Sequence, residues 1–129
     1  MALLEWTDDM SVGNPIIDTQ HRRLIDLVND FHRALENGRG QESISFVLDN
    51  LNDYIEMHFR SEEALFRISD YPEKDAHMEE HRRLMERVEE YLKRFKSGNK
   101  YLTVEILDFI QEWVEHHIKV TDAGYKDYI

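Results

Sequence analysis

Apolar residues recur every three or four positions along four stretches of the chain, the period of an amphipathic α-helix. The first stretch begins at Asn14-Pro15, a typical N-cap followed by proline at the first helical position, and stops at Asn37-Gly38. The second runs from about Gln41 to Phe66, the third lies between Pro72 and Ser97, and the fourth runs from Leu102 to near Gly124. Short turns between helices of similar length predict an all-α, up-down-up-down antiparallel four-helix bundle.

This pattern predicts a single domain, with an arm at 1–14, the bundle at 15–124 and a short tail at 125–129. The apolar stripe of the second helix is expected to pass through Val47 and Leu65. Trp6 is expected to pack the arm over the bundle.

Polar side chains interrupt the apolar stripes at six positions where helical periodicity demands buried residues: His21, His58, Glu62, His77, His81 and His117. Two pairs are spaced four residues apart, so both members of each pair share one helix face. Antiparallel packing brings all six to the same end of the bundle. Because each buried polar group needs a partner, we interpret the set as a metal site.

Composition narrows the chemistry of this site. The chain has no cysteine, so a metal must be held by nitrogen and oxygen atoms. A net charge of -11 argues against nucleic acid or an anionic membrane as a partner. The sequence has neither an apolar run of membrane-spanning length nor the basic start of a signal peptide, so we expect no membrane insertion and a cytoplasmic location.

The motifs that carry these polar positions resemble those of the hemerythrin family, specifically its single-domain bacterial members, over nearly the whole chain. The matching segments are Ile17-Asp18-Thr19-Gln20-His21, His58 with Glu62, His77 with His81, and Trp113 through His117 to Asp122. The resemblance implies two non-heme iron ions (Fe2+/Fe3+) joined by an oxo or hydroxo bridge. It assigns His77, His81 and His117 to one iron, His21 and His58 to the other, and Glu62 and Asp122 as bridges.

The seventh ligand comes from the resemblance alone. Periodicity leaves Glu115 and Asp122 as equal candidates, because residue 122 is rotated by about 140° from His117 on an ideal α-helix. His116 stands where the family often has asparagine; a surface role, a role beside the ligands and a role as competing ligand are all open, in that order. His32 lies on the shoulder of its stripe and is not expected to be a ligand.

The resemblance implies reversible dioxygen binding by a carrier, storage or delivery protein, and no enzymatic activity. Five imidazoles and two carboxylates donate less negative charge than the glutamate-rich sites that oxidise substrates, which agrees with binding. Leu24, Phe59 and Trp113 are expected to wall the oxygen pocket at the iron held by His21 and His58. The alternatives are an oxygen or redox sensor acting through a partner and a peroxide- or nitric-oxide-scavenging di-iron enzyme.

Overall fold

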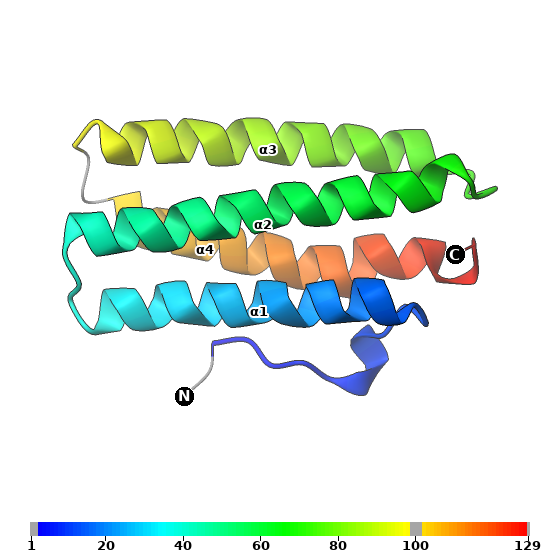
Figure 1. Ribbon diagram of the computed structural model, residues 1–129, viewed down its shortest axis with the longest axis horizontal. Coiled ribbons are helices and arrows are strands. Elements are labelled where there is room, and N and C mark those ends of the chain that lie inside the picture. The colour runs from blue at the N-terminus through cyan, green and yellow to red at the C-terminus, as the bar shows by residue number, and fades with distance from the viewer. Residues whose placement is uncertain (1–2, 99–101, 129) are drawn as a thin grey trace.

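Four antiparallel helices form the body of the protein. The computed structural model describes residues 3–98 and 102–128, and at 120–123 it describes the backbone only. The helices are α1 (Pro15–Glu36), α2 (Gln41–Arg67), α3 (Lys74–Lys96) and α4 (Thr103–His116). Successive helices run in opposite directions, and no strand occurs within these ranges (Figure 1). The predicted all-α antiparallel bundle is confirmed.

The ends of α1 follow from local chemistry. The side-chain oxygen of Asn14 accepts hydrogen bonds from the backbone N–H groups of Ile16 at 3.0 Å and Ile17 at 3.2 Å, the expected N-cap. At the other end, Gly38 adopts a φ of 62°, a conformation that glycine takes without steric cost. The helix therefore starts and stops where the sequence signals lie.

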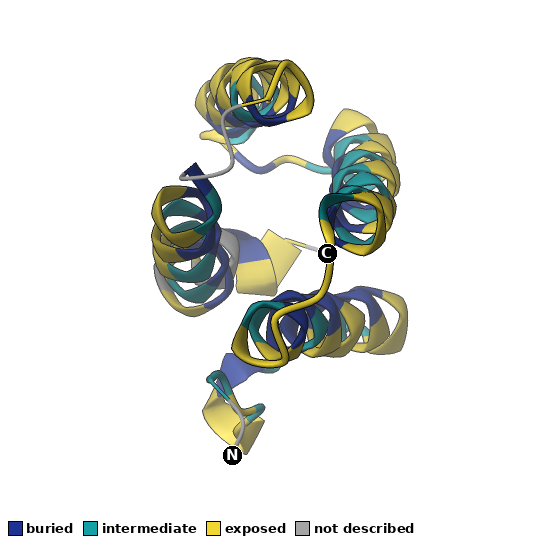
Figure 2. Cartoon of the chain, turned by 90° about the vertical axis from the view of Figure 1, so that its left-hand side faces the viewer, coloured by how far each residue is buried: buried dark blue, intermediate teal, exposed yellow. Residues whose placement is uncertain are grey.

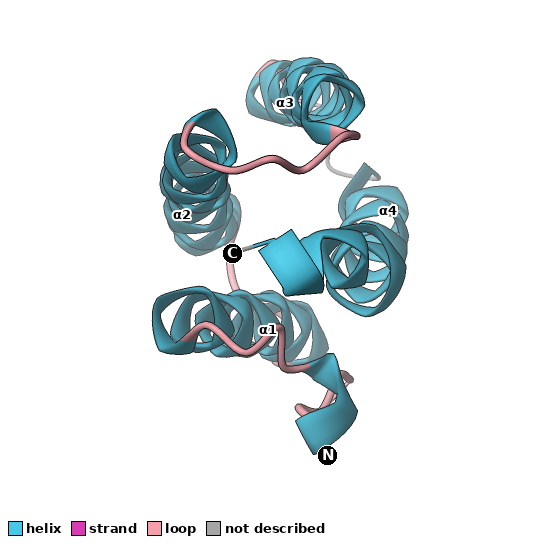
Figure 3. Cartoon of the chain, turned by 90° about the vertical axis from the view of Figure 1, so that its right-hand side faces the viewer, coloured by secondary structure: helices cyan, strands magenta, loops and turns pink. Residues whose placement is uncertain are grey.

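The fourth helix changes its geometry and continues beyond Gly124, where we expected it to end. It becomes a π-helix, η3 (His117–Thr121), and then a 3-10 helix, η4 (Asp122–Tyr128). Tyr125, in the segment expected to be a short tail, is fully buried, and its ring lies 5.1 Å from that of Phe66. This C-terminal segment lies across one end of the bundle, as Figure 3 shows.

Buried positions lie on the sides of the helices that face one another (Figure 2). In α2 the buried stripe passes through Leu48 and Phe66, while Val47 and Leu65, the expected positions, are half-buried. Each pair of neighbours lies on the edge of the same apolar face, so periodicity alone does not choose between them. The packing of α2 against both α1 and α3 makes the choice.

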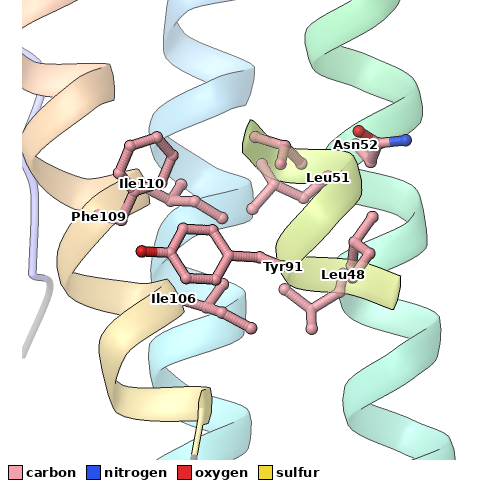
Figure 4. A pocket seen from close by; sticks show the side chains of 9 residues that line it. Leu48, Leu51, Asn52, Tyr91, Ile106, Phe109 and Ile110 are labelled. Atoms are coloured by element: carbon pink, nitrogen blue, oxygen red, sulfur yellow. The ribbon is translucent and has the colours of Figure 1, made fainter. Parts of the chain in front are cut away.

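An apolar pocket lies between α2, α3 and α4, in the half of the bundle away from the C-terminal segment (Figure 4). Its lining residues are Leu48, Leu51, Asn52, Val88, Tyr91, Leu92, Ile106, Phe109 and Ile110. None of these is a histidine or an acidic residue, so this pocket is not the predicted metal site. None of the described helices is both long and apolar enough to cross a bilayer.

The buried side chain of Asn29 helps to hold the N-terminal arm along α1. The Asn29 side-chain oxygen accepts the backbone N–H groups of Leu3 and Leu4 at 2.9 and 3.0 Å, and its amide donates to the Leu4 carbonyl at 2.9 Å. The guanidinium of Arg22 lies 4.7 Å above the Trp6 ring, so Trp6 does pack the arm on the bundle. The arm's short 3-10 helix, η1 (Asp8–Met10), contacts η3.

Replacing Asn29 with alanine should therefore loosen the arm. Three hydrogen bonds are lost, each with a net value of about 0.5–1.5 kcal/mol, so the free energy of unfolding should fall by about 2–4 kcal/mol. Urea denaturation measures the change. Asn50→Ala removes the same side chain from an exposed position of α2 and should change the stability little; an equal loss in both variants would contradict the role of the Asn29 contacts.

Candidate metal centre

Six of the seven predicted ligands meet at the end of the bundle closed by the C-terminal segment. His21 lies in the second turn of α1, His58 and Glu62 near the end of α2, His77 and His81 at the start of α3, and His117 directly after α4. All six side chains are buried, with at most 3% of each residue exposed. The prediction that antiparallel order would bring them together at one end is confirmed.

The six residues form two adjoining groups of metal-ligand type. One consists of His21, His58, Glu62 and His117, the other of Glu62, His77, His81 and His117. Within each group the potential ligand atoms lie within 4.8 Å of one another. Glu62 and His117 belong to both groups, so the two positions are neighbours.

Glu62 lies at the centre of this arrangement. Its Oε1 is 2.7 Å from the Nε2 of His58, 3.1 Å from that of His117 and 3.6 Å from that of His81. Its Oε2 is 4.0 Å from the Nε2 of His77. One carboxylate therefore faces ring nitrogens from its own helix and from two other helical segments, as a bridging ligand would.

The donor set fits iron. Imidazole nitrogens suit iron, zinc, copper and nickel, carboxylate oxygen is compatible with all of these, and no soft thiolate is present. A cation bound among these five buried imidazoles and the buried carboxylate would interact favourably with all of them. The arrangement can hold two metal ions that share Glu62.

The π-helix η3 affects the position of Asp122, the seventh ligand that the resemblance implies. In η3 the backbone hydrogen bonds join residues five apart instead of four, which widens the turn and reduces the rotation between positions 117 and 122. The distortion that Asp122 needs in order to share a face with His117 is therefore present in the backbone. The side chain of Asp122 lies outside the described residues.

Glu115, the other candidate for the seventh ligand, forms an ion pair with Lys119. Its Oε1 accepts the ammonium group of Lys119 at 3.0 Å, and 43% of its side chain is exposed. It belongs to neither ligand group. Asp122 stays a prediction from the resemblance.

Two further histidines lie outside both groups. His116 is the last residue of α4 and is exposed, beside a surface depression that Arg87 and Trp113 also line. The Nδ1 of His32 is 3.4 Å from a carboxylate oxygen of Glu36 on the surface of α1. His116 thus takes the first of its three expected positions, and His32 is not a ligand in the described arrangement.

Aromatic side chains pack directly on the ligands. Phe59 is stacked on His81, with ring centroids 3.8 Å apart, and the half-buried Trp113 is stacked on His117 at 4.5 Å. The resemblance assigns both of these histidines to the three-histidine iron, not to the iron of His21. Helical geometry explains these contacts. Phe59 is rotated by about 100° from His58 around the axis of α2, toward α3, and Trp113 lies one turn before His117.

Of the three expected pocket walls, Leu24 differs from the aromatic pair. It lies one turn after His21 on α1, is fully buried and belongs to the main apolar core. Tyr125 adds a contact that the sequence did not suggest, because its ring centroid lies 5.5 Å from that of His77. The aromatic cover therefore extends to the end of the bundle.

Sequence reasoning missed two hydrogen-bonding partners of the ligands. The side-chain oxygen of Gln20 is 2.8 Å from His58 Nδ1, and Oε2 of Glu63 is 3.2 Å from His81 Nδ1. Burial raises the pKa of Glu63 above its ordinary value, and the positive charge of Arg67 opposes this. Both partners directly neighbour a ligand in sequence, which is the signal that could have identified them.

Comparison with known proteins agrees with this geometry. The sequence model of the hemerythrin HHE cation-binding domain matches residues 12–129. The chain is 36% identical to a bacteriohemerythrin of Stenotrophomonas maltophilia over 129 residues, covering 100% of this chain and 83% of the relative. It is 32% identical to a bacteriohemerythrin of Methylococcus capsulatus, covering 97% and 95% of the two chains.

Solved structures agree as well. The crystal structure of a wild-type hemerythrin superposes with a TM-score of 0.90 at 31% identity, covering 98% of this chain and 97% of the other. The crystal structure of a hemerythrin mutant gives a TM-score of 0.91 with the same identity and coverage. The two adjoining ligand groups, the fold and these relatives together show that the chain belongs to the hemerythrin family of di-iron, oxygen-binding proteins.

Proposed function

We propose that this protein binds dioxygen reversibly as a carrier, store or delivery protein and is not an enzyme. The observation that carries the proposal is the pair of buried ligand groups that share Glu62. Two irons held there would supply the redox-active centre at which the family binds dioxygen. Dioxygen is the partner that we propose; the net charge of -11 argues against nucleic acid, and the cytoplasmic location stays a prediction.

We assign the ligands as the family resemblance implies. His77, His81 and His117 would hold one iron, and His21 and His58 would hold the other; His117 lies in both ligand groups, and the resemblance assigns it to the first iron. Glu62 would bridge the two; its Oε1 lies 2.7 Å from His58 and 3.6 Å from His81, which belong to different ligand groups. Asp122 is proposed as the second bridge, supported by the π-helical backbone that leads to it.

The residues around the ligands support reversible dioxygen binding over catalytic turnover. Phe59, Trp113 and Tyr125 place aromatic rings on the ligand histidines and exclude water from them. The histidine beside the ligands that could transfer protons, His116, is exposed and lies in neither ligand group. The chain's own residues thus hold the metals and keep solvent away.

One spectroscopic experiment tests the proposal. Metal-free protein is loaded with ferrous iron under anaerobic conditions, exposed to air, and then flushed with argon. A visible band that appears in air and disappears under argon, through repeated cycles, is the expected result. Irreversible bleaching, or continuous consumption of added peroxide or nitric oxide, would favour the scavenging enzyme; an oxygen-dependent complex with a second protein would favour a sensor.

The wall residues should control the lifetime of the oxygenated form. Shortening Leu24 to alanine, or removing the indole with Trp113→Ala, admits water beside the ligands, and the visible band should decay several-fold faster without loss of iron. Decay in air and iron content are measured together. Leu24→Ala also costs about 2–5 kcal/mol of stability, so the matched control is Leu51→Ala, an equally buried leucine two turns from His58.

His116→Ala provides the second control for the wall variants, because the exposed imidazole is not expected to shield the centre. Its band should decay at the wild-type rate. If both wall variants also decay at that rate, the assignment of the walls is wrong. If His116→Ala alone removes a steady peroxide consumption seen in the wild type, the protein acts as an enzyme.

A further inference from the structure

The ring nitrogens that face away from Glu62 have different partners on two of the ligands. His58 directs its Nε2 to Glu62, at 2.7 Å, and its Nδ1 to the side-chain oxygen of Gln20, at 2.8 Å. His81 directs its Nε2 to Glu62, at 3.6 Å, and its Nδ1 to Oε2 of Glu63, at 3.2 Å. Each outer oxygen accepts the Nδ1 proton that an imidazole carries when its Nε2 binds a metal, so both partners fix the tautomer and the ring orientation.

The orientation of the Gln20 amide is itself fixed. Its Nε2 donates to the hydroxyl of Ser61 at 3.0 Å, so its oxygen faces His58. Gln20 is 8% exposed, and the Glu63 side chain is 25% exposed. Neither contact is an open surface contact in which solvent would cancel the effect of the acceptor.

The two partners differ in charge. Gln20 offers a neutral amide oxygen to the ligand on the side of His21, whereas Glu63 offers a carboxylate to the ligand on the side of His77. A charged acceptor makes a stronger hydrogen bond than a neutral one and raises the basicity of the imidazole that donates to it. His81 should therefore bind a metal more strongly than its own ring alone would.

We propose that Glu63 and Gln20 are positioning residues that make the two metal positions unequal, so that the position of His77, His81 and His117 fills first. The inference rests on the ligand set given under the proposed function. A third histidine favours the same position, so the share due to Glu63 has to be measured by changing its charge while all the ligands stay in place.

The experiment is an anaerobic titration of the metal-free chain with Co2+, followed by calorimetry and by the visible Co2+ bands. Two binding steps are expected, and His77→Ala should abolish the tighter one. Glu63→Gln keeps a side chain of the same shape and removes the charge; it should weaken the tighter step by about 10- to 100-fold and leave the weaker step unchanged. Gln20→Glu should tighten the weaker step.

A matched control separates this role from a general effect of charge. Glu56→Gln makes the same change on the same helix at a site whose carboxylate pairs with Arg60 at 2.6 Å on the surface. It should leave both binding steps and the Co2+ bands unchanged. Glu63→Gln should shift the bands of the first Co2+ bound, because the donor strength of His81 changes; a merely structural effect would not produce that shift.

The outcomes distinguish the inference from the function on which it rests. If Glu63→Gln leaves both binding constants and the bands unchanged, or weakens both steps equally, the inference is overturned and the ligand set stands. If His77→Ala retains both steps at wild-type strength, the ligand set itself is wrong.

Discussion

Replacing Glu62 with alanine is expected to leave the purified protein with well below one iron per chain, compared with two in the wild type. The Oε1 atom of this carboxylate lies within 3.6 Å of three ligand nitrogens, and the residue belongs to both ligand groups. Its loss removes a ligand from both metals at once and also the negative charge that balances them. Iron content is measured by elemental analysis after anaerobic reconstitution.

The control for this variant is Met78→Leu. Met78 lies between the ligands His77 and His81 in sequence but packs against the smaller apolar cluster, and leucine has a similar volume. This variant should keep both irons. A Glu62→Ala protein that still binds two irons, or a wild-type protein that never binds more than one, would falsify the shared di-iron site.

Removing the metal should lower the thermal midpoint by about 10 °C. A ligand that binds only the native state, at a free concentration about 100-fold above its dissociation constant, adds about 2.7 kcal/mol to the free energy of unfolding. Here the metal also relieves the cost of five histidines and a glutamate packed in the interior. Calorimetry of chelated and reloaded protein measures the difference, and equal midpoints at neutral pH would count against metal binding by the native state.

The same stabilisation should disappear in acid. Histidine binds a metal only when neutral, so protons compete with the metal as the pH falls below the ordinary histidine range of about 6.5. Bound iron and the gain in midpoint should therefore be lost together as the pH is lowered. His32→Gln removes a surface histidine that lies outside the ligand groups and should leave this pH dependence unchanged.

The helices and the meeting of the ligands could be predicted because both depend on local signals. A regular apolar period, the Asn14 cap and short turns determine an antiparallel bundle, and that order alone carries His21 and His117 to the same end. Which of two neighbouring apolar residues is buried could not be predicted. Leu48 is buried in preference to Val47 because of how α2 packs on its neighbours, which a helical period does not contain.

The remaining differences at the site also arise from tertiary structure. A π-helix after His116 leaves no mark in a sequence, since it depends on how the last turn of the helix is held by its surroundings, here including η1 of the arm. The contacts of Gln20 and Glu63 require side-chain directions that spacing does not provide. For the same reason the sequence suggested Phe59 and Trp113 as walls but not that their rings stack on His81 and His117.

The ligand groups draw on α1, α2, α3 and the π-helix η3 that follows α4, from His21 to His117. A ribosome releases a chain N-terminal end first, and domains fold in that order during synthesis. The groups that meet here stay incomplete until η3 has emerged and docked, so we expect both metals to bind only after this segment has been made. Metals bound there would join helices that are far apart in sequence and would hold the last of these segments to be made against the first.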